Sequence, residues 1–374
     1  MTVGSKFIQR CDHCHREFGP EFRTRCPDCA GLVEIHYDLT RARLHDSDDP
    51  YERFFDLLPI DDPADLLDLG DGRTPCVHAE RLGGSMGLAN VFLKVESANP
   101  SGTTKDRMAA VVLARFNELG TTEFVSSSTG NSSNALARGI QMYPRFRMHL
   151  FLGSAFAQRF RYESPDVEVH VCEGLDFTEA FNASRSFAHD RGLPFEAGFF
   201  NPSRREGLKI AYFEAVDQIP AEIDWYVQAS SSAMGVYGTA KGAAELLAFG
   251  RIGRIPRMVC VQQESCAPMV RGFERDVPSL PDELVVEHPS GIAEAILRGD
   301  PRGCYPYVFR MLKSSGGTAV SVSEWEIVEA RSQLQRTEGL ECGFSAATTI
   351  AALKKLTERR SVGSDDCVML NLTD

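Results

Sequence analysis

The sequence predicts an α/β protein built on a mostly parallel sheet. Short apolar runs predict strands at 91–95, 123–127, 146–152, 167–171, 225–229, 258–262 and 367–372. Between them, apolar residues at helical spacing predict helices at 105–119, 134–142, 176–191, 235–249 and 323–337. Strands that alternate with helices in this way form parallel sheets that are covered by helices on both faces.

Length and composition are consistent with this fold class. The chain has 374 residues, 43% apolar and 25% charged, which is enough for two globular domains. The net charge of −12 argues against nucleic-acid or anionic-membrane partners. No apolar run reaches about 20 residues, and the first residues lack a secretory pattern. With an odd number of cysteines, 11, we expect a cytoplasmic protein with free thiols.

The individual elements have ordinary local signals. In the strand at 146–152, apolar residues alternate with Arg and His, and in the strand at 167–171 three valines alternate with Glu168 and His170. The helix at 176–191 begins with a pattern that resembles a capping box, with Asp176 as the N-cap and Glu179 at the third helical position.

Four cysteines near the N-terminus form two CxxC pairs: Cys11, Cys14, Cys26 and Cys29. Two such turns separated by eleven residues match a tetrathiolate zinc ribbon. Because four thiolates fill a tetrahedral site, we expect the Zn²⁺ ion to be structural rather than catalytic. Four reduced thiols without a metal are the alternative, and His13 and His15 are rival ligands.

A lysine lies just after the turn that follows the predicted strand at 91–95. Residues 99–107 read Asn-Pro-Ser-Gly-Thr-Thr-Lys-Asp-Arg, which places Lys105 at the start of an apolar helix. A helix N-terminus disfavours a nearby cation, so it lowers the pKa of a lysine and frees the amine for Schiff-base chemistry. For Lys105 alone, a solvated side chain would be the simpler interpretation.

Several motifs together resemble the threonine synthase branch of the fold-type II (tryptophan synthase beta-like) pyridoxal-phosphate (PLP) enzymes. Residues 99–107 are similar to the family's NPTGSFKDR, and residues 69–75 (Leu-Gly-Asp-Gly-Arg-Thr-Pro) to its LGEGxTP. The cysteine ribbon followed by residues 31–38 is another shared feature. The resemblance extends over nearly the whole chain and implies that Lys105 is the Schiff-base lysine that binds PLP.

A serine-rich segment resembles the family's ASTGN loop. Residues 126–133 read Ser-Ser-Ser-Thr-Gly-Asn-Ser-Ser between a predicted strand and a predicted helix. Backbone N–H groups and hydroxyls at a helix start favour capture of a carboxylate. The resemblance implies that Asn131 binds the ring hydroxyl of the cofactor, and that Ser128, Thr129 and Ser132 hold the substrate carboxylate.

A second serine-rich segment occupies the position of the family's phosphate-binding loop. It follows the strand at 225–229 and retains one glycine of the family's GNxGN or GTGGT pattern. Successive N–H groups and hydroxyls at a helix start can converge on an anion. By resemblance, the residues that bind the cofactor phosphate are Ser230, Ser231, Ser232, Ala233, Met234 and Gly235.

Two further segments carry site residues by resemblance. Residues 201–209 are similar to NPxRxEGxKT, which makes Arg204 a ligand of a substrate phosphate. Residues 368–373 are similar to VVxxLT, which places Thr373 beside the pyridine nitrogen of the cofactor. A neutral hydroxyl there leaves that nitrogen largely unprotonated, which suits elimination and replacement more than transamination.

The resemblance also implies an architecture. We expect a zinc ribbon at 1–37, a large PLP-binding α/β domain at 38–110 and 201–374, and a small mobile α/β domain at 111–200. Each α/β domain would have three layers, with the cofactor in the cleft between the domains. The family is commonly dimeric, so a homodimer is expected.

The implied activity is that of a PLP-dependent lyase or synthase acting on a small amino acid with an anionic leaving group. Threonine synthase converts phosphohomoserine into threonine and phosphate. Residues 198–200 (Gly-Phe-Phe) depart from that branch. Residues 153–159 lack its usual Gly-Lys, for which Arg159 or Arg161 is the candidate substitute. The alternative is a cysteate synthase-like or specialised-metabolism replacement on phosphoserine or another activated amino acid. A further alternative is a non-catalytic paralogue.

Overall fold

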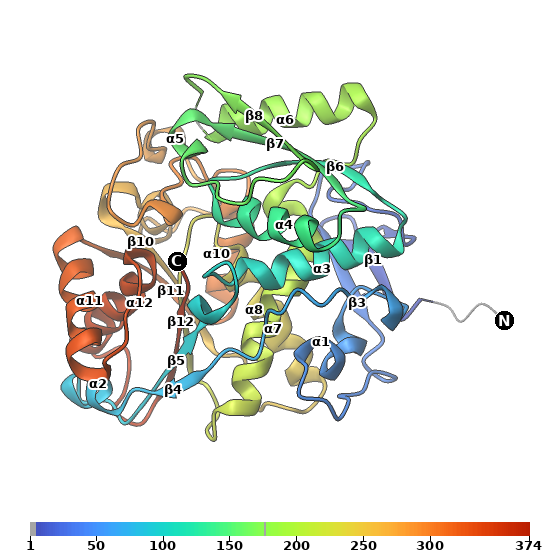
Figure 1. Ribbon diagram of the computed structural model, residues 1–374. Helices are drawn as coiled ribbons and strands as arrows, with labels where there is room; N and C mark the ends of the chain where they lie inside the picture. The colour runs from blue at the N-terminus through green and yellow to red at the C-terminus, as the bar shows by residue number, and fades with distance from the viewer. Residues whose placement is uncertain (1–4, 176) are drawn as a thin grey trace. The chain divides into compact units, whose positions relative to one another are not determined.

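The computed structural model describes residues 5–175 and 177–374, and they form two compact units (Figure 1). Unit 1 comprises Met1–Arg73 and Lys105–Ile210, and unit 2 comprises Thr74–Thr104 and Ala211–Asp374. The predicted functional domains (1–37, 38–110 with 201–374, and 111–200) and the predicted homodimer stay predictions.

The elements alternate along the chain as the sequence predicts. The strands are β1 Phe7–Cys11, β2 Glu17–Phe18, β3 Val33–Tyr37, β4 Cys76–His78, β5 Asn90–Val95, β6 Glu123–Ser127, β7 Arg147–Gly153, β8 Val167–Cys172, β9 Trp225–Ala229, β10 Arg257–Gln263, β11 Thr318–Val322 and β12 Cys367–Leu372. The helices are α1 Pro50–Arg53, α2 Glu80–Ser85, α3 Lys105–Glu118, α4 Asn131–Met142, α5 Ser154–Ala157, α6 Phe177–Arg191, α7 Pro202–Gln218, α8 Met234–Ala248, α9 Pro268–Glu274, α10 Tyr305–Ser314, α11 Glu324–Glu338 and α12 Phe344–Glu358.

Unit 2 is organised around a six-stranded sheet with the order β11-β10-β9-β12-β5-β4. Neighbouring strands are parallel except for β4, which pairs antiparallel with β5 at the edge. Every residue of β9 and β12 is buried, as expected for central strands with helices on both faces. Trp225 and Val227 belong to the core that includes α12, whereas Tyr226, between them, packs edge-on against Tyr212 of α7.

Helices α11 and α12 lie side by side in unit 2 (red in Figure 1), and α12 packs against the sheet. Helix α11 begins with a capping box in which Ser323 and Glu326 exchange side-chain and backbone hydrogen bonds. It ends at Gly339, whose φ of 69° is the left-handed conformation that glycine adopts without strain. Local sequence therefore sets both ends of this helix.

Unit 1 contains the parallel three-stranded sheet β6-β7-β8 and the N-terminal sheet β2-β1-β3. Helix α6 packs against β6 and β7, and α3 packs against α4. Helix α7 approaches α3 closely at Gly207, where an added Cβ would overlap the carbonyl oxygen of Arg107 and lie 2.9 Å from the Cα of Met108. The glycine of the sequence motif at 201–209 is thus a packing requirement.

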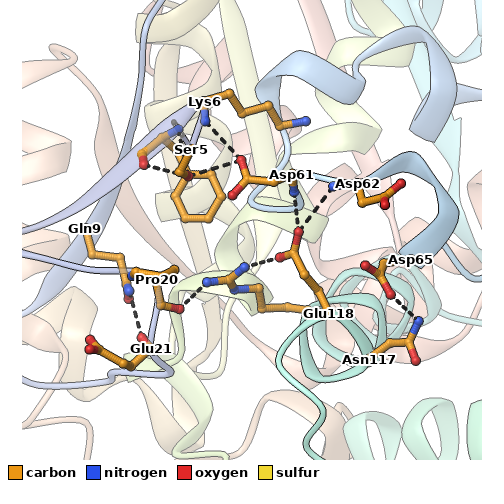
Figure 2. Close-up of polar contacts among 12 residues, drawn as sticks. Ser5, Lys6, Gln9, Pro20, Glu21, Asp61, Asp62, Asp65, Asn117 and Glu118 are labelled. Carbon is orange, nitrogen blue, oxygen red and sulfur yellow. Dashed lines mark hydrogen bonds and ion pairs between the residues drawn. The ribbon is translucent and has the colours of Figure 1, made fainter. Parts of the chain in front are cut away.

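Polar contacts connect the start of β1 with the C-terminal end of α3 in unit 1 (Figure 2). The Asp61 carboxylate accepts a hydrogen bond from the backbone N–H of Lys6 at 2.9 Å. The Glu118 carboxylate accepts one from the backbone N–H of Asp61 at 2.5 Å. Asn117 donates to Asp65 at 2.6 Å. The segment 61–65 therefore bridges the N-terminal sheet and the helix that Lys105 begins.

The predicted strands and helices are confirmed to within a few residues at their ends, and the sheets of the two α/β regions are mostly parallel. Among the longer helices, α7, α10 and α12 were not predicted from the sequence. The predicted N-cap Asp176 lies outside the described residues. Within the described part of the chain, no helix is long and apolar enough to cross a membrane.

Substitution of Gly207 by alanine should destabilise the protein. The new Cβ would force α7 away from the backbone of α3, and such overpacking costs about 1–3 kcal/mol of unfolding free energy. Gly84→Ala is the matched control, because Gly84 is also helical and nothing lies within 4 Å of an added Cβ. Urea denaturation of both variants tests the packing, and equal stability of the two would refute it.

Candidate active site

The carboxyl ends of three parallel strands lie together at one edge of the sheet in unit 2. Strand β12 pairs with β5 on one side and with β9 on the other, so Asn371 lies opposite both Lys94 and Gln228. The predicted site segments 96–104 and 230–235 begin directly after β5 and β9. Ligands of open α/β sheets bind at this kind of edge.

Thr373, the first residue after β12, is bonded to the segment that leads to Lys105. Its buried hydroxyl oxygen accepts a hydrogen bond from the backbone N–H of Thr104 at 3.0 Å. Since the oxygen is the acceptor in this bond, the hydroxyl proton can be donated to another group. The hydroxyl of Thr104 is itself buried and makes no hydrogen bond to any described residue. These two hydroxyls fit a ligand that brings an acceptor such as a ring nitrogen.

The segment between β9 and α8 has the geometry of an anion-binding turn. Ala233 is left-handed (φ 56°, ψ 21°), and α8 follows with no side-chain cap from the described residues. A left-handed residue before a helix turns successive N–H groups toward one point, where they bind anions. A Cβ at Gly235 would lie 2.5 Å from Nε2 of Gln228, so a larger residue there would displace the amide of that side chain. This turn fits a phosphate group.

The remaining predicted residues of that turn differ in their exposure to solvent. Ser230 is buried and donates a hydrogen bond to the carbonyl of Gln228 at 3.1 Å. Ser231 and Ser232 are partly exposed, and Met234 is buried as the first residue of α8. The non-glycine left-handed conformation of Ala233 costs roughly 1–3 kcal/mol, which is typical of functional sites.

The serine-rich loop between β6 and α4 lies in unit 1, as Lys105 does. The hydroxyl oxygen of Ser128 accepts hydrogen bonds from the N–H groups of Gly130 (3.1 Å) and Ser133 (3.2 Å). Thr129 is partly exposed between them, and Asn131 is the first residue of α4. The hydroxyl of Ser128 thus holds the loop that the sequence predicts to bind a carboxylate.

Arg204 forms a buried ion pair that the sequence analysis did not foresee. Its guanidinium makes a two-pronged contact with the carboxylate of Glu196, which is fully buried. The same guanidinium donates to the hydroxyl of Ser132 at 3.1 Å, and Asn201 donates to Glu196 at 2.9 Å. Arg204 therefore orients Ser132 in the predicted carboxylate loop, while Glu196 neutralises its charge. An acidic residue within the apolar run 193–200 was the available signal.

Arg159 lies against the same loop. A Cβ at Gly130 would lie 3.1 Å from Cβ of Arg159, and Asn134 of α4 donates to the carbonyl of Arg159 at 2.8 Å. The backbone N–H of Arg161 donates to Asn134 at 2.9 Å. Of the two arginines that the sequence analysis named, Arg159 has its side chain packed on the loop.

A buried lysine supports the strand that precedes Lys105. Lys94 of β5 is fully buried, and its ammonium contacts Glu214 at 2.8 Å, Gln218 at 2.7 Å and the carbonyl of Thr74 at 2.7 Å. The hydroxyl of Thr74 donates to the buried Glu96 at 2.7 Å. These partners anchor residues 96–104 on the side of β5, and no sequence signal identified them.

Asp71, in the motif at 69–75, is buried in unit 1. One of its carboxylate oxygens accepts a hydrogen bond from the hydroxyl of Tyr51, and the other has no hydrogen-bond partner among the described residues. Burial raises the pKa of the Asp71 carboxyl to about 7, against the lowering effects of Tyr51 and the Arg107 guanidinium. The neutral acid is therefore favoured in the folded state below that pH.

The four N-terminal cysteines converge as predicted. Their sulfur atoms lie within 4.8 Å of one another, with Cys11–Cys29 and Cys14–Cys26 distances of 3.5 Å. A Cβ at Gly31 would lie 2.7 Å from the sulfur of Cys11, so glycine leaves room for the cluster. Neither His13 nor His15 belongs to the group of candidate ligands. The arrangement fits a tetrathiolate metal site.

The predicted site residues fall into two sets. Unit 1 holds Lys105, Ser128, Thr129, Asn131, Ser132, Arg204 and the four cysteines. Unit 2 holds Ser230, Ser231, Ser232, Ala233, Met234, Gly235 and Thr373.

Comparison with known proteins defines the class. Residues 67–374 match the family model described as pyridoxal-phosphate dependent enzyme. The chain is 30% identical to a threonine synthase of Methanocaldococcus jannaschii over 97% of its length and 90% of that protein. It is 26% identical to a cysteate synthase of Methanospirillum hungatei, over 97% of this chain and 88% of that protein. The processed form of threonine deaminase isoform 2 from Solanum lycopersicum shares the fold, with a TM-score of 0.67 at 16% identity over 89% of this chain and 92% of that one.

The chain thus belongs to the family of pyridoxal-phosphate dependent enzymes. Within that family it is a fold-type II enzyme of the threonine synthase branch, and it is a PLP-dependent lyase or synthase. The loop geometry of unit 2 agrees with this membership, because the uncapped start of α8 suits a cofactor phosphate and the hydroxyl of Thr373 suits a ring nitrogen.

Substitution of Asp71 by asparagine should flatten the pH dependence of stability. The raised pKa means that the folded protein binds more protons than the unfolded chain between about pH 4 and 7, so the unfolding free energy falls as pH rises through that window. The loss amounts to roughly 4 kcal/mol at most. Urea denaturation from pH 4 to 8 should show a shallower decline in Asp71→Asn than in the exposed control Asp48→Asn. Equal declines of the unfolding free energy in the two variants would contradict the raised pKa of Asp71.

Proposed function

We propose that the protein catalyses a PLP-dependent replacement on a small amino acid with an anionic leaving group, and that it converts phosphohomoserine into threonine and phosphate. The observation that supports this type of reaction is the hydrogen bond of the Thr373 hydroxyl. Its oxygen accepts from the backbone N–H of Thr104, so its proton can be donated to the cofactor. A neutral hydroxyl at the ring nitrogen favours elimination and replacement. The threonine synthase relative, aligned over 97% of the chain, supports the choice of substrate.

The residues present would hold PLP through several groups. Lys105 would carry it covalently, Asn131 would bind the ring hydroxyl, and Thr373 would donate to the ring nitrogen. The segment 230–235 would bind the phosphate through its N–H groups and serine hydroxyls. When bound, PLP supplies an electron sink that labilises the α-proton of an amino acid and a leaving group at its β- or γ-carbon.

The chain's own residues would bind the substrate and move its protons. The Nζ atom of Lys105 would remove the α-proton as a general base and return a proton later in the cycle. Ser128, Thr129 and Ser132 would hold the substrate carboxylate with α4 N–H groups. Arg204 would keep Ser132 in position through its 3.1 Å hydrogen bond, and it would also approach the distal phosphate.

A second candidate function has its own supporting observation. Because Glu196 neutralises the guanidinium of Arg204, that arginine is a weaker ligand for a dianionic distal phosphate than an unpaired one. This favours a shorter substrate, such as phosphoserine, whose phosphate is replaced by another nucleophile. The cysteate synthase relative at 26% identity is consistent with that chemistry.

We further propose that the four-cysteine cluster binds a structural Zn²⁺ ion. Four thiolates within 4.8 Å of one another match the usual tetrahedral site, and backbone N–H groups of His13 and Cys14 already point at the sulfur of Cys11 at 3.4 and 3.5 Å. The ion would hold β1 and its neighbouring turns together and would have no open coordination position.

The PLP-loaded enzyme should release phosphate from phosphohomoserine and form threonine, whereas Lys105→Ala should lose activity by at least about 10³-fold, since a positioned general base contributes 10²–10⁴-fold by itself. Lys313→Ala is the matched control, because Lys313 is half-exposed and pairs with Asp276. Phosphate assay and mass spectrometry of the product provide the measurement.

Parallel reactions with phosphoserine plus sulfite, and with acetylserine, separate the two candidates. Turnover of phosphoserine without threonine formation from phosphohomoserine would replace the first proposal by the second. Equal activity of the Lys105 and Lys313 variants would refute both.

Zinc removal should lower stability without the loss of the PLP absorption band. We expect one equivalent of zinc bound to cysteine, as measured by elemental analysis, and its loss in Cys26→Ser together with a lower thermal midpoint, because metal binding free energy contributes to folding. Cys76→Ser is the control, since Cys76 lies on β4 in unit 2. A Cys26→Ser protein with unchanged stability and zinc content would contradict the site.

A further inference from the structure

A second group of metal-binding side chains lies on the three-stranded sheet of unit 1, and the proposed catalysis does not use it. His149 is on β7, and Glu168 lies opposite it on the parallel strand β8. His170 follows two residues later on β8, so its side chain projects from the same face as that of Glu168. Candidate ligand atoms of these three residues lie within 4.8 Å of one another.

His149 is held in the tautomer that a metal ion requires. The residue is 2% exposed, and its Nε2 atom lies 2.8 Å from a carboxylate oxygen of Glu123 on β6. Because a carboxylate accepts, Nε2 carries the proton, and in the neutral ring Nδ1 then presents a lone pair. A carboxylate behind a histidine is the usual support of a metal-binding imidazole. The buried Nδ1 has no hydrogen bond within the described part of the chain.

The two histidines face the same carboxylate. Nδ1 of His149 lies 3.3 Å from Oε2 of Glu168, and Nε2 of His170 lies 3.4 Å from Oε1. The His170 nitrogen is also buried without a hydrogen bond among the residues described. Two ligand atoms bound to zinc at about 2.1 Å and at the tetrahedral angle are about 3.4 Å apart. The observed separations therefore suit a single cation that is bound by both imidazole rings and by the carboxylate of Glu168.

We propose that His149, Glu168 and His170 form a second metal site, which binds a divalent first-row transition ion such as Zn²⁺ and leaves one position for water. Imidazole and carboxylate are ligands that such ions prefer. The side chains of His170 and Glu168 are 27% and 47% exposed, so an ion can enter from solvent. The ion would fasten the edge strand β8 to β7.

Aromatic side chains pack against the imidazole rings of His149 and His170. A neighbouring arginine, in contrast, competes with the proposed metal ion for the carboxylate of Glu168. His170 stacks on Phe151 with centroids 4.5 Å apart, and Phe187 of α6 lies 5.0 Å from the ring of His149. Arg147 approaches Oε2 of Glu168 at 3.3 Å and so competes for the oxygen nearest His149. Its guanidinium is 56% exposed and lies 3.9 Å from Glu123, to which it can shift.

The site is tested by calorimetric titration with Zn²⁺. The sample is the full-length protein, with PLP bound and with the four-cysteine cluster already filled with zinc. We expect one additional equivalent to bind, with at least about tenfold weaker binding in Glu168→Gln and in His170→Gln. Arg147→Ala should bind more tightly, because it removes the competing cation. His189→Gln should bind as the unchanged protein does, since His189 is exposed on α6 beside Asp190.

Cobalt substitution distinguishes this site from the cysteine cluster. The additional Co²⁺ should show weak visible absorption without the strong thiolate charge-transfer band. Since Glu168 and His170 are partly exposed, their variants should keep the far-ultraviolet circular dichroism of the fold. Absence of the additional equivalent, or its retention at unchanged affinity in both Glu168→Gln and His170→Gln, would overturn the proposal.

Discussion

Backbone hydrogen bonding of β12 to β5 and β9 is the interaction on which the predicted site of unit 2 depends. The two neighbours lie more than 100 residues away from β12 in sequence and on its opposite sides. Parallel pairing requires that all three strands end at the same edge, since their hydrogen-bond ladders run in one direction. The segments at 96–104, 230–235 and 373–374 therefore begin side by side, and the Thr104–Thr373 hydrogen bond is one result.

Buried charges hold predicted site segments in each of the two units. Lys94 is surrounded by an acidic partner, an amide and a carbonyl, and Arg204 is paired with Glu196. Burial of one partner alone would leave an uncompensated charge, at a cost of about 3–5 kcal/mol, so each pair constrains the positions of both residues. Lys94 thereby restrains the strand that precedes residues 96–104, the segment that leads to Lys105. Arg204 restrains the serine-rich segment that contains Ser132.

In the proposed function, the type of reaction and the choice of substrate depend on different parts of the chain. The first residue after β12, Thr373, carries a hydroxyl rather than a carboxylate, so the group that it would offer to a ring nitrogen is neutral whatever the substrate is. We propose that discrimination between leaving groups depends instead on charges around the β6–α4 loop, where Arg204 is neutralised by Glu196 and Arg159 packs against Gly130. Small changes in those pairings can alter the substrate while the cofactor chemistry stays the same.

The sequence by itself determined the class of fold, the elements and the family motifs, because apolar periodicity and turn residues act over a few neighbouring positions. Lys105 at a helix start, the two CxxC turns and the serine-rich loops were all visible in this way. The pairing of Glu196 with Arg204 and that of Glu214 with Lys94 were not, because an acidic residue in a sequence does not show which base it will meet. Only tertiary structure decided these pairs, and it also placed Glu123, His149, Glu168 and His170 together from three strands. Parallel register sets such neighbours, and it arises from packing and hydrogen bonding between segments that are distant in the chain.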